Sequence, residues 1–172
     1  MKNIVILGST GSIGTNTLDI VDRFPQEFRV VGLTAGSNDE KLEAQIRKFR
    51  PAFAALANEA AAARLRDRCA DLPVKILAGN EGVAEVAQSQ EAELVISAIV
   101  GGAGLLPTLA AIRAGKQIAL ANKEPMVMAG ALMQAEAKKH HVRIFPIDSE
   151  HSAIFQSLEG HRREDVKRII LT

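Results

Sequence analysis

Three glycines near the N-terminus have the spacing of a dinucleotide-binding turn. Gly8, Gly11 and Gly14 lie in GSTGSIG, directly after the apolar run NIVIL and at the start of a helical pattern through Leu18 and Ile20. Glycine lacks a Cβ, so such a turn can reverse tightly, let backbone N–H groups approach a pyrophosphate and pack a helix against a strand. The first N–H groups of the helix then face the phosphate. A purely structural strand-to-helix turn is the alternative, but this context favours a dinucleotide site.

The residues after the second expected strand favour NADP over NAD. An NAD site usually places Asp or Glu about 20 residues after the glycine turn, where the carboxylate holds the ribose 2′-hydroxyl. Here the segment is LTAGSN at 33–38, with no carboxylate to repel a 2′-phosphate and with small donors at Ser37 and Asn38. No Arg or Lys precedes Lys41 in this neighbourhood. A plain polar loop is the alternative interpretation.

Two carboxylates follow a later apolar run. Asp148 and Glu150 stand in DSEHS directly after VRIFPI. Paired oxygen ligands at the carboxyl end of a strand suit Mg²⁺ or Mn²⁺, and such a cation can chelate a substrate carbonyl and hydroxyl. The alternative is that Asp148 caps a helix and Glu150 complements the helix dipole in its first turn. His151 is more typical of a helix surface than of a metal ligand.

A lysine stands at the end of another expected strand. Lys123 lies in ALANKE, close in this kind of fold to the sheet edge where a nicotinamide would bind. A lysine there can hold a substrate oxygen or phosphate. A charged helix start is equally consistent with the spacing alone.

These residues are positioned by alternating strands and helices. Short β-branched runs alternate with Ala-rich helical stretches, which predicts βαβ units in a Rossmann-like, doubly wound, mostly parallel α/β sheet with helices on both faces. Continuously apolar strands are typical of strands buried on both faces. We expect strands at 3–7, 29–34, 52–57, 74–77, 94–99, 117–121, 142–147 and 168–172. We expect helices at 12–23, 39–49, 59–69, 81–90, 107–114, 126–140 and 152–158.

The composition argues against nucleic-acid-binding, membrane-spanning and disulfide-rich classes of protein. Apolar residues make up 47% and charged residues 24% of 172 residues, so a packed core is expected. Lys and Arg number 21 against 20 Asp and Glu, so the protein has no large net positive charge that would attract nucleic acid or an anionic membrane. The chain lacks Trp and Tyr, the usual stacking platforms for single-stranded nucleic acid, and has no apolar run long enough to span a membrane. The lone Cys69 excludes an internal disulfide framework and is expected to be a small buried residue.

The sequence contains one boundary signal, near Asp148, where the nucleotide-binding pattern ends. We therefore expect a dinucleotide-binding domain over 1–147 and the start of a catalytic α+β domain over 148–172. The last residues resemble a buried strand, which suggests a fragment. The N-terminus has neither the pattern of a signal peptide nor a transit peptide, which favours a bacterial cytoplasm.

Several motifs together resemble one family over the whole chain. GSTGSIG, AGSN, AIVGGAGLLPTLAAIRAGKQIALANKE and DSEHSAIFQ, in this order, are similar to 1-deoxy-D-xylulose 5-phosphate reductoisomerases. GSTGSIG is shared with other reductases, whereas ANKE followed by DSEHSAIFQ is specific to this family. The resemblance turns the metal site from one alternative into the favoured interpretation.

The resemblance also assigns roles to residues. It implies that NADPH binds at the glycine turn and that Mg²⁺ or Mn²⁺ binds at the acidic pair, with a third ligand, another Glu, beyond Thr172. Cofactor contacts are implied for Gly8, Thr10, Gly11, Ser12, Ile13, Gly36, Ser37, Asn38, Asn122 and Glu124. Substrate contacts are implied for Lys123, Ser149 and Glu150, catalytic roles for Lys123 and Glu150, and metal ligation for Asp148 and Glu150.

The implied reaction isomerises 1-deoxy-D-xylulose 5-phosphate and reduces the resulting aldehyde with NADPH, giving 2-C-methyl-D-erythritol 4-phosphate for isoprenoid synthesis. A metal that clamps adjacent oxygens stabilises charge during the rearrangement, and the nicotinamide delivers hydride beside it. A homodimer is implied, and the 172-residue chain alone is expected to bind NADPH without turnover.

Two positions depart from the family pattern. Pro125 stands after Glu124 where a small hydroxyl residue is usual, although proline is tolerated in the first turn of a helix. Ser37 stands where some members have Lys, which weakens the expected grip on the 2′-phosphate.

Two other functions are considered. An aspartate-semialdehyde-dehydrogenase-like reductase would need a nucleophilic cysteine near the nicotinamide, and Cys69 lies in a helix well before the central crevice. A non-catalytic NADP-binding sensor would use the glycine turn but would have no purpose for Lys123, Asp148 and Glu150.

Overall fold

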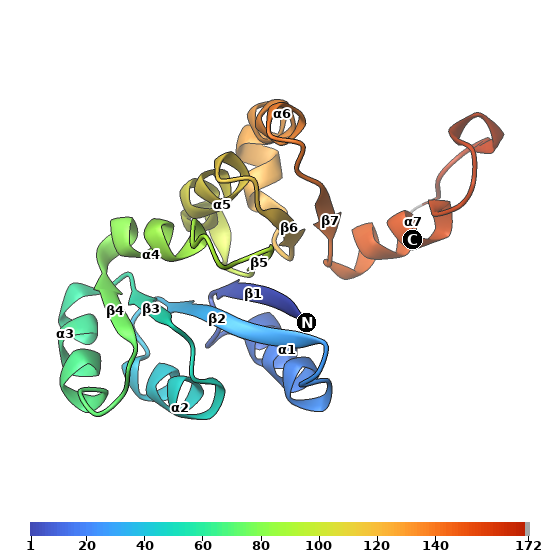
Figure 1. Cartoon of the computed structure of the whole chain (residues 1–172). Coiled ribbons are helices and arrows are strands. Elements are labelled where there is room, and N and C mark those ends of the chain that lie inside the picture. Colours follow the sequence, from blue (N-terminus) through green and yellow to red (C-terminus); the bar gives the residue numbers. More distant parts are fainter. Residues whose placement is uncertain (171–172) are drawn as a thin grey trace.

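The computed structural model describes residues 1–170 and contains a central sheet covered by helices on both faces (Figure 1). The sheet has seven strands in the order β4-β3-β2-β1-β5-β6-β7, and every neighbouring pair is parallel. The strands are β1 (Lys2–Leu7), β2 (Phe28–Ala35), β3 (Phe53–Leu56), β4 (Lys75–Ala78), β5 (Leu94–Ser97), β6 (Gln117–Leu120) and β7 (Ile144–Pro146). The doubly wound, parallel α/β fold expected from the sequence is confirmed.

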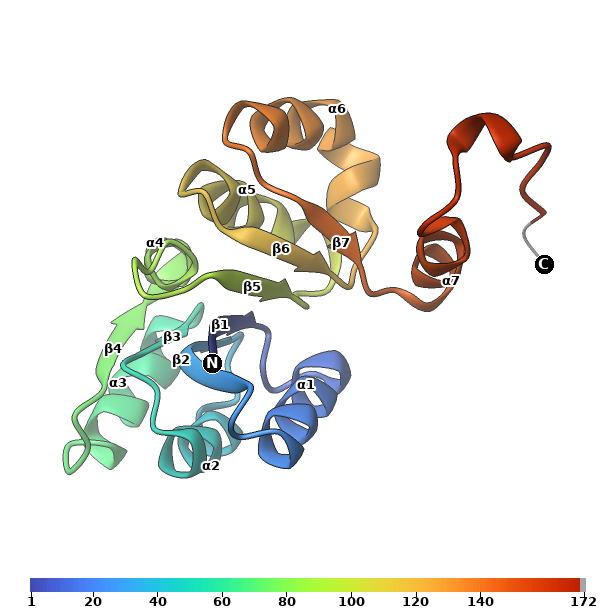
Figure 2. The same ribbon diagram turned by 45° about the vertical axis from the view of Figure 1, so that its right-hand side comes forward.

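The helices divide between the two faces of the sheet, as Figure 2 shows from a second angle. One layer contains α1 (Ser12–Arg23), α2 (Asp39–Phe49) and α3 (Glu59–Arg68). The other contains α4 (Gly79–Ala87), the short 3-10 helix η1 (Gly101–Gly104), α5 (Leu105–Arg113) and α6 (Glu124–Lys139). In the described part of the chain, no helix is long and apolar enough to cross a membrane.

Alternate residues of the strands supply two separate cores. In β1, Ile4 and Ile6 join the core beneath α1, α2 and α3, whereas Val5 and Leu7 join the core beneath α4, α5 and α6. This follows from the two-residue period of a strand, which sends successive side chains to opposite faces. Burial on both faces explains why the strand sequences are continuously apolar.

The strand order reverses between β1 and β5. Strands β1 to β4 extend in one direction across the sheet, and the chain then returns to place β5, β6 and β7 on the other side of β1. In open α/β sheets, ligands bind in the crevice at the carboxyl ends of the strands where the order reverses. The fold therefore predicts a ligand site at the loops after β1, β2 and β5.

Most predicted elements occur within a few residues of their expected bounds, and α1 and α2 match their predicted ranges. Helix α6 begins earlier than predicted, at Glu124, because Pro125 occupies the first turn, where its missing N–H leaves no hydrogen bond unmade. The same helix has a kink at Ala129, whose φ of −146° is not helical. The 3-10 turn η1 was not predicted.

The C-terminal segment differs from the prediction. After β7 the chain enters α7 (Ser149–Leu158) and the short turn η2 (Arg163–Asp165), which extend away from the sheet (Figures 1 and 2). The predicted strand at 168–172 is wrong for residues 168–170, which are irregular; residues 171–172 lie outside the described part. A strand needs a partner for its N–H and C=O groups, and the path of α7 brings these residues to no sheet edge. Ile169 and Ile170 are exposed. The predicted domain boundary near Asp148 remains a prediction.

Helices α2 and α3 are joined by a partly buried ion pair. Asp39, at the start of α2, accepts hydrogen bonds from Arg64 Nε and Nη2 at 2.9 and 3.2 Å, and Arg68 Nη1 lies 3.5 Å from it. The Asp39 side chain is 10% exposed. The hydrogen bond from Arg64 lowers the pKa of Asp39, with burial opposing and both arginine charges contributing further.

We predict that Asp39→Asn lowers the stability of the chain at neutral pH. The pKa of Asp39 is lower in the folded than in the unfolded state, so the carboxylate stabilises the fold above the ordinary carboxyl range and this contribution is lost as the pH falls through it. Urea unfolding measured from pH 7 to pH 3 should show a wild-type advantage that shrinks with acidity. Asp22→Asn is the control, since Asp22 pairs with Lys48 in solvent. A difference that is constant over this pH range would contradict the prediction.

Candidate active site

The glycine turn brings three backbone segments into close contact. Gly8 has a φ of +80°, and a Cβ built there would lie 2.7 Å from the carbonyl oxygen of Ala98, at the end of β5. A Cβ on Gly14 would lie 2.4 Å from the carbonyl oxygen of Gly8. Real Cβ atoms do not approach backbone this closely, so both positions require glycine. The turn therefore packs α1 directly against β1, as a dinucleotide turn must.

Polar groups buried beneath the turn hold its shape. The Gly8 and Ser9 N–H groups donate to the Thr34 carbonyl oxygen at 3.1 and 2.8 Å, which ties the turn to the end of β2. Ser9 Oγ donates to Gln45 Oε1 at 2.7 Å, and Gln45 Nε2 donates back to the Ser9 carbonyl oxygen at 2.9 Å. Ser9, Thr34 and Gln45 are all buried. These hydrogen bonds connect β1, β2 and α2, so the turn is preformed.

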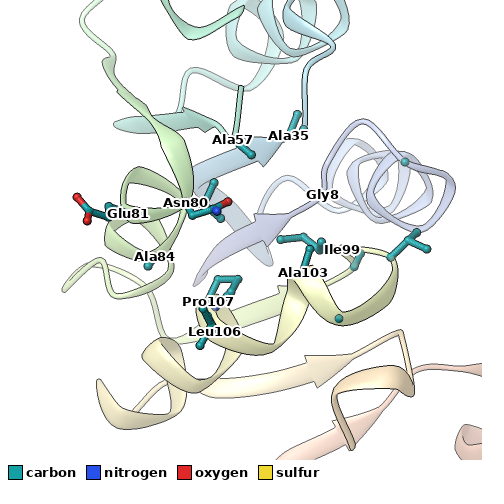
Figure 3. Close-up of a pocket in the computed structure, with 16 residues that line it drawn as sticks. Gly8, Ala35, Ala57, Asn80, Glu81, Ala84, Ile99, Ala103, Leu106 and Pro107 are labelled. Carbon is teal, nitrogen blue, oxygen red and sulfur yellow. The ribbon is translucent and has the colours of Figure 1, made fainter. Parts of the chain in front are cut away.

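A cleft opens above this turn at the point where the strand order reverses (Figure 3). Its volume is about 550 Å³. Its walls come from the loops after β1, β2, β3 and β5 and from the starts of α4 and α5. Asn80 and Glu81 lie on the α4 side, and Leu106 and Pro107 lie below (Figure 3). The lining residues are Gly8, Gly11, Ala35, Gly36, Ala57, Asn80, Glu81, Val83, Ala84, Ala98, Ile99, Val100, Gly102, Ala103, Leu106 and Pro107. A long, mostly apolar cleft with backbone N–H groups at one side suits a dinucleotide.

Some of the predicted cofactor residues line this cleft, and others lie in the turns next to it. Gly8, Gly11 and Gly36 line it. Ser12 and Ile13 form the exposed start of α1, with Thr10 before them in the turn. Ser37 is exposed in the turn after β2, and Asn38 caps α2 by accepting a hydrogen bond from the Lys41 N–H at 3.0 Å.

Asn122 lies in the loop after β6, and Glu124 is the first residue of α6. Asn122 Nδ2 donates to the carbonyl oxygen of Ile99 at 2.6 Å, which connects the loop after β6 to a residue that lines the cleft. Glu124 begins α6, and its Oε2 atom is buried without a hydrogen-bond partner among residues 1–170. A buried carboxylate oxygen without a donor is costly, so a ligand that donates to it would be favoured.

An acidic cluster is formed by Asp148 and Glu150, with the ammonium group of Lys123 between them. Lys123 Nζ lies 3.3 Å from Asp148 Oδ2 and 3.8 Å from Glu150 Oε1. Ser149 Oγ donates to Glu150 Oε2 at 2.7 Å, and His151 Nδ1 lies 3.1 Å from Asp148 Oδ1. Asp148 occupies the position before α7, yet its side chain makes no capping hydrogen bond to that helix. Its carboxylate instead contacts Lys123 and the side chain of His151 in the first turn of α7.

Asp148 and Lys123 shift each other's pKa toward the charged form. Hydrogen bonding with Glu150 is the main influence that lowers the pKa of Asp148, to about 2, and Lys123 contributes to the same effect. The hydrogen bond with Asp148 is likewise the main influence that raises the pKa of Lys123. Asp148 is consequently ionised and Lys123 protonated at neutral pH. A carboxylate that stays ionised is suited to bind a cation.

An apolar groove adjoins the cluster between α6 and α7. Asn122, Lys123, Asp148 and His151 form its polar side, and the groove has a volume of about 660 Å³. Its apolar side is formed by Leu120, Met126, Val127, Ile144, Pro146, Ile154, Phe155 and Leu158. Phe145 and Phe155 meet edge to face with ring centroids 6.2 Å apart, which fixes α7 against β7. The cluster thus has solvent access and an apolar floor.

The acidic pair can supply part of a metal site. Within residues 1–170 no group of three His, Cys, Asp or Glu side chains is arranged to hold a metal ion. Asp148 and Glu150 provide oxygen ligands of the kind that Mg²⁺ and Mn²⁺ prefer, and both face the Lys123 ammonium. A divalent cation between these carboxylates would replace the positive charge that the lysine now supplies.

The chain matches two family models along its length. The model of 1-deoxy-D-xylulose 5-phosphate reductoisomerase matches residues 4–130, and that of the C-terminal domain of the same enzyme matches residues 144–172. The chain belongs to the 1-deoxy-D-xylulose 5-phosphate reductoisomerase family. The resemblance expected from the motifs is confirmed.

Reductoisomerases similar in sequence and in structure support this membership. The enzyme of Chlorobaculum tepidum is 55% identical over 172 residues, which are 100% of this chain and 45% of that protein. A crystal structure of DOX-P reductoisomerase in complex with NADPH, fosmidomycin and magnesium is 45% identical, with a TM-score of 0.90 over 93% of this chain and 40% of the other. The Zymomonas mobilis reductoisomerase in complex with NADPH is 40% identical, with a TM-score of 0.92 over 97% of this chain and 44% of the other. The chain thus spans less than half the length of these reductoisomerases.

Cys69 is not placed to act as a catalytic nucleophile, which agrees with membership of the reductoisomerase family. The thiol is buried in the core beneath α1, α2 and α3, and burial raises its pKa. A thiol with a raised pKa is a poor nucleophile. The aspartate-semialdehyde-dehydrogenase-like alternative, which needs an activated cysteine at the cleft, is therefore not supported.

Some residues that contact the cleft or the glycine turn were not predicted from the sequence to have a role. Ser9, Thr34 and Gln45 hold the glycine turn, and only the polar character of Thr34 within a buried strand hinted at such a role. Asn80 reaches the cleft from the start of α4, for which the sequence carries no signal. The sequence showed Lys41 only as the first basic residue after Ser37 and Asn38, with no role assigned to it. In the structure its Nζ donates to the carbonyl oxygen of Thr10 at 2.8 Å.

Proposed function

We propose that this chain forms the NADPH-binding part and some of the active site of an enzyme that converts 1-deoxy-D-xylulose 5-phosphate to 2-C-methyl-D-erythritol 4-phosphate. The observation that carries the proposal is the meeting of Lys123, Asp148 and Glu150 beside a dinucleotide cleft, joined to it by the Asn122–Ile99 hydrogen bond. A homodimer and a cytoplasmic location are expected from the family resemblance and the sequence.

The cleft fits NADPH. Gly8 and Gly14 pack against backbone atoms that a Cβ would clash with, which keeps α1 close to the end of β1. The backbone N–H groups at the start of α1 can then bind a pyrophosphate in the cleft. The unpartnered Oε2 atom of Glu124 offers an acceptor to a donor such as the nicotinamide carboxamide. Following the family resemblance, we assign the pyrophosphate to Thr10, Gly11, Ser12 and Ile13, the adenosine end to Gly36, Ser37 and Asn38, and the nicotinamide side to Asn122 and Glu124.

The acidic pair fits Mg²⁺ or Mn²⁺. Asp148 and Glu150 are ligands of the right chemistry, and the low pKa of Asp148 keeps its carboxylate available at neutral pH. When bound, the metal supplies Lewis-acid stabilisation of charge on substrate oxygens. Ser149, which now donates to Glu150, lies where it can donate to substrate instead.

Each residue of the cluster has a task in this reaction. Lys123 stays protonated and places a positive charge where substrate oxygens become more negative during the rearrangement. Asp148 and Glu150 hold the lysine in place before ligands arrive, because their oxygens lie 3.3 and 3.8 Å from its Nζ. The apolar floor of the adjoining groove reduces the water around the reacting carbon and strengthens these charge interactions.

A non-catalytic NADP sensor is the second candidate function. It would account for the glycine turn and the cleft, but the acidic cluster would then have no task beyond stability. The two functions differ in whether the acidic cluster affects the fate of bound NADPH.

The test is NADPH oxidation by protein of the relatives' full length, with 1-deoxy-D-xylulose 5-phosphate and with or without Mn²⁺. Metal-dependent oxidation is expected, and the 172-residue chain should bind NADPH without consuming it. If the full-length protein binds NADPH but does not oxidise it with this substrate, the proposal fails and the sensor function is favoured. Measurable turnover by the 172-residue chain would refute the expectation that it is inactive alone.

A further inference from the structure

We propose that Lys41, on the first turn of α2, is the residue that selects NADPH over NADH in this chain by binding the adenosine 2′-phosphate. The proposal deepens the function above, since it assumes that the cleft binds a dinucleotide. It concerns a position that the family resemblance did not assign.

Lys41 connects the start of α2 to the glycine turn. Its backbone N–H is bound by Asn38 Oδ1 at 3.0 Å, which fixes it one helical turn after Ser37 and Asn38. Its Nζ donates to the carbonyl oxygen of Thr10 at 2.8 Å and therefore spans from α2 to the glycine turn. An ammonium on a flexible, exposed stem can turn from this neutral carbonyl to a phosphate.

The acidic residues next to Lys41 in the sequence pair with arginines of α3 and not with Lys41. Asp39 is paired with Arg64 and Arg68 of α3, and Glu40 Oε1 lies 3.6 Å from Arg68 Nη2. Lys41 itself forms no ion pair within residues 1–170, and its described polar partner is the Thr10 carbonyl. The α2 side of the cleft entrance therefore presents one uncompensated positive charge to a ligand.

The position of that charge matches the chemistry of NADP. In doubly wound folds, the ribose of adenosine lies at the end of the second strand, and a nearby cation accommodates the 2′-phosphate. Ser37 and Asn38 offer only neutral donors at that place. Lys41 supplies from the first turn of α2 the charge that position 37 lacks. A charge-assisted contact to phosphate is stronger than a neutral one.

The test compares ligands with and without the 2′-phosphate. Binding of NADPH, NADH, 2′,5′-ADP and 5′-AMP to the wild-type chain, Lys41→Gln and Lys48→Gln is measured by calorimetry. Glutamine keeps a donor for the Thr10 carbonyl but removes the charge. Lys48 is the matched control, because it is an exposed lysine of the same helix that pairs with Asp22 instead.

Lys41→Gln is expected to weaken the binding of NADPH and of 2′,5′-ADP about tenfold, because one charge-assisted contact is lost. The affinities for NADH and 5′-AMP should change little. Lys48→Gln should match the wild type for all four ligands. The double variant Lys41→Gln with Ser37→Lys should regain selectivity. An unchanged NADPH-to-NADH affinity ratio in Lys41→Gln overturns the inference, including the case where both affinities fall together because the turn has loosened. A wild-type chain that binds none of the four ligands refutes the proposed dinucleotide site itself.

Discussion

Asp148→Asn in the full-length protein is expected to reduce kcat/KM for 1-deoxy-D-xylulose 5-phosphate by about a thousandfold. Asparagine keeps the shape of the side chain but removes the negative charge that faces Lys123 and that we propose to bind the metal. A metal ion contributes several kcal/mol to a charged transition state, and each 1.4 kcal/mol corresponds to a factor of about ten. The measurement is the rate of NADPH oxidation over a range of Mn²⁺ concentrations.

NADPH affinity should be unchanged in Asp148→Asn, which separates loss of chemistry from loss of the cofactor. Asp165→Asn is the matched control, because Asp165 lies on the same C-terminal segment but pairs with Arg162 away from the cluster. Wild-type turnover by Asp148→Asn would show that this carboxylate is not part of the active site. A fall in both turnover and NADPH affinity would indicate a structural role instead.

Gly14→Ala is expected to destabilise the chain and to prevent NADPH binding. The added Cβ would lie 2.4 Å from the Gly8 carbonyl oxygen and 2.5 Å from the Ser9 Cα, and both are backbone atoms that cannot turn aside. Helix α1 must therefore move away from β1, and overpacking of this kind costs about 1–3 kcal/mol. Because α1 supplies N–H groups for the pyrophosphate, its displacement also removes the cofactor site.

Urea unfolding and NADPH titration of the same samples check this prediction. Gly36→Ala is the control for stability, because its added Cβ has nothing within 4 Å. The free energy of unfolding of that control should change by less than about 1 kcal/mol. If Gly14→Ala has wild-type stability and NADPH affinity, the close packing of α1 on the glycine turn is not required.

Local patterns in the sequence were sufficient for most of the fold. Helices α1 and α2 matched their predicted ranges because apolar residues recur with helical spacing, and Asn38 before α2 is a typical N-cap. The strands were recognisable because burial on both faces makes each one a short apolar run. The strand predicted at 168–172 failed because an apolar run becomes a strand only beside a partner, and α7 leads the chain away from the sheet.

The sequence by itself determined the parallel α/β class, because strand-like and helix-like patterns alternate along the whole chain. It also determined the glycine turn and the residue types of the acidic pair, because these depend only on neighbouring residues. Only the tertiary structure decided which of these groups meet. Lys123 reaches Asp148 and Glu150 because β6 and β7 are parallel neighbours whose carboxyl ends share one edge of the sheet. Lys41 reaches Thr10 because β1 and β2 are also parallel neighbours, so α2 begins beside the glycine turn. Such contacts depend on strand order and on the path of the chain between strands, which no local pattern encodes.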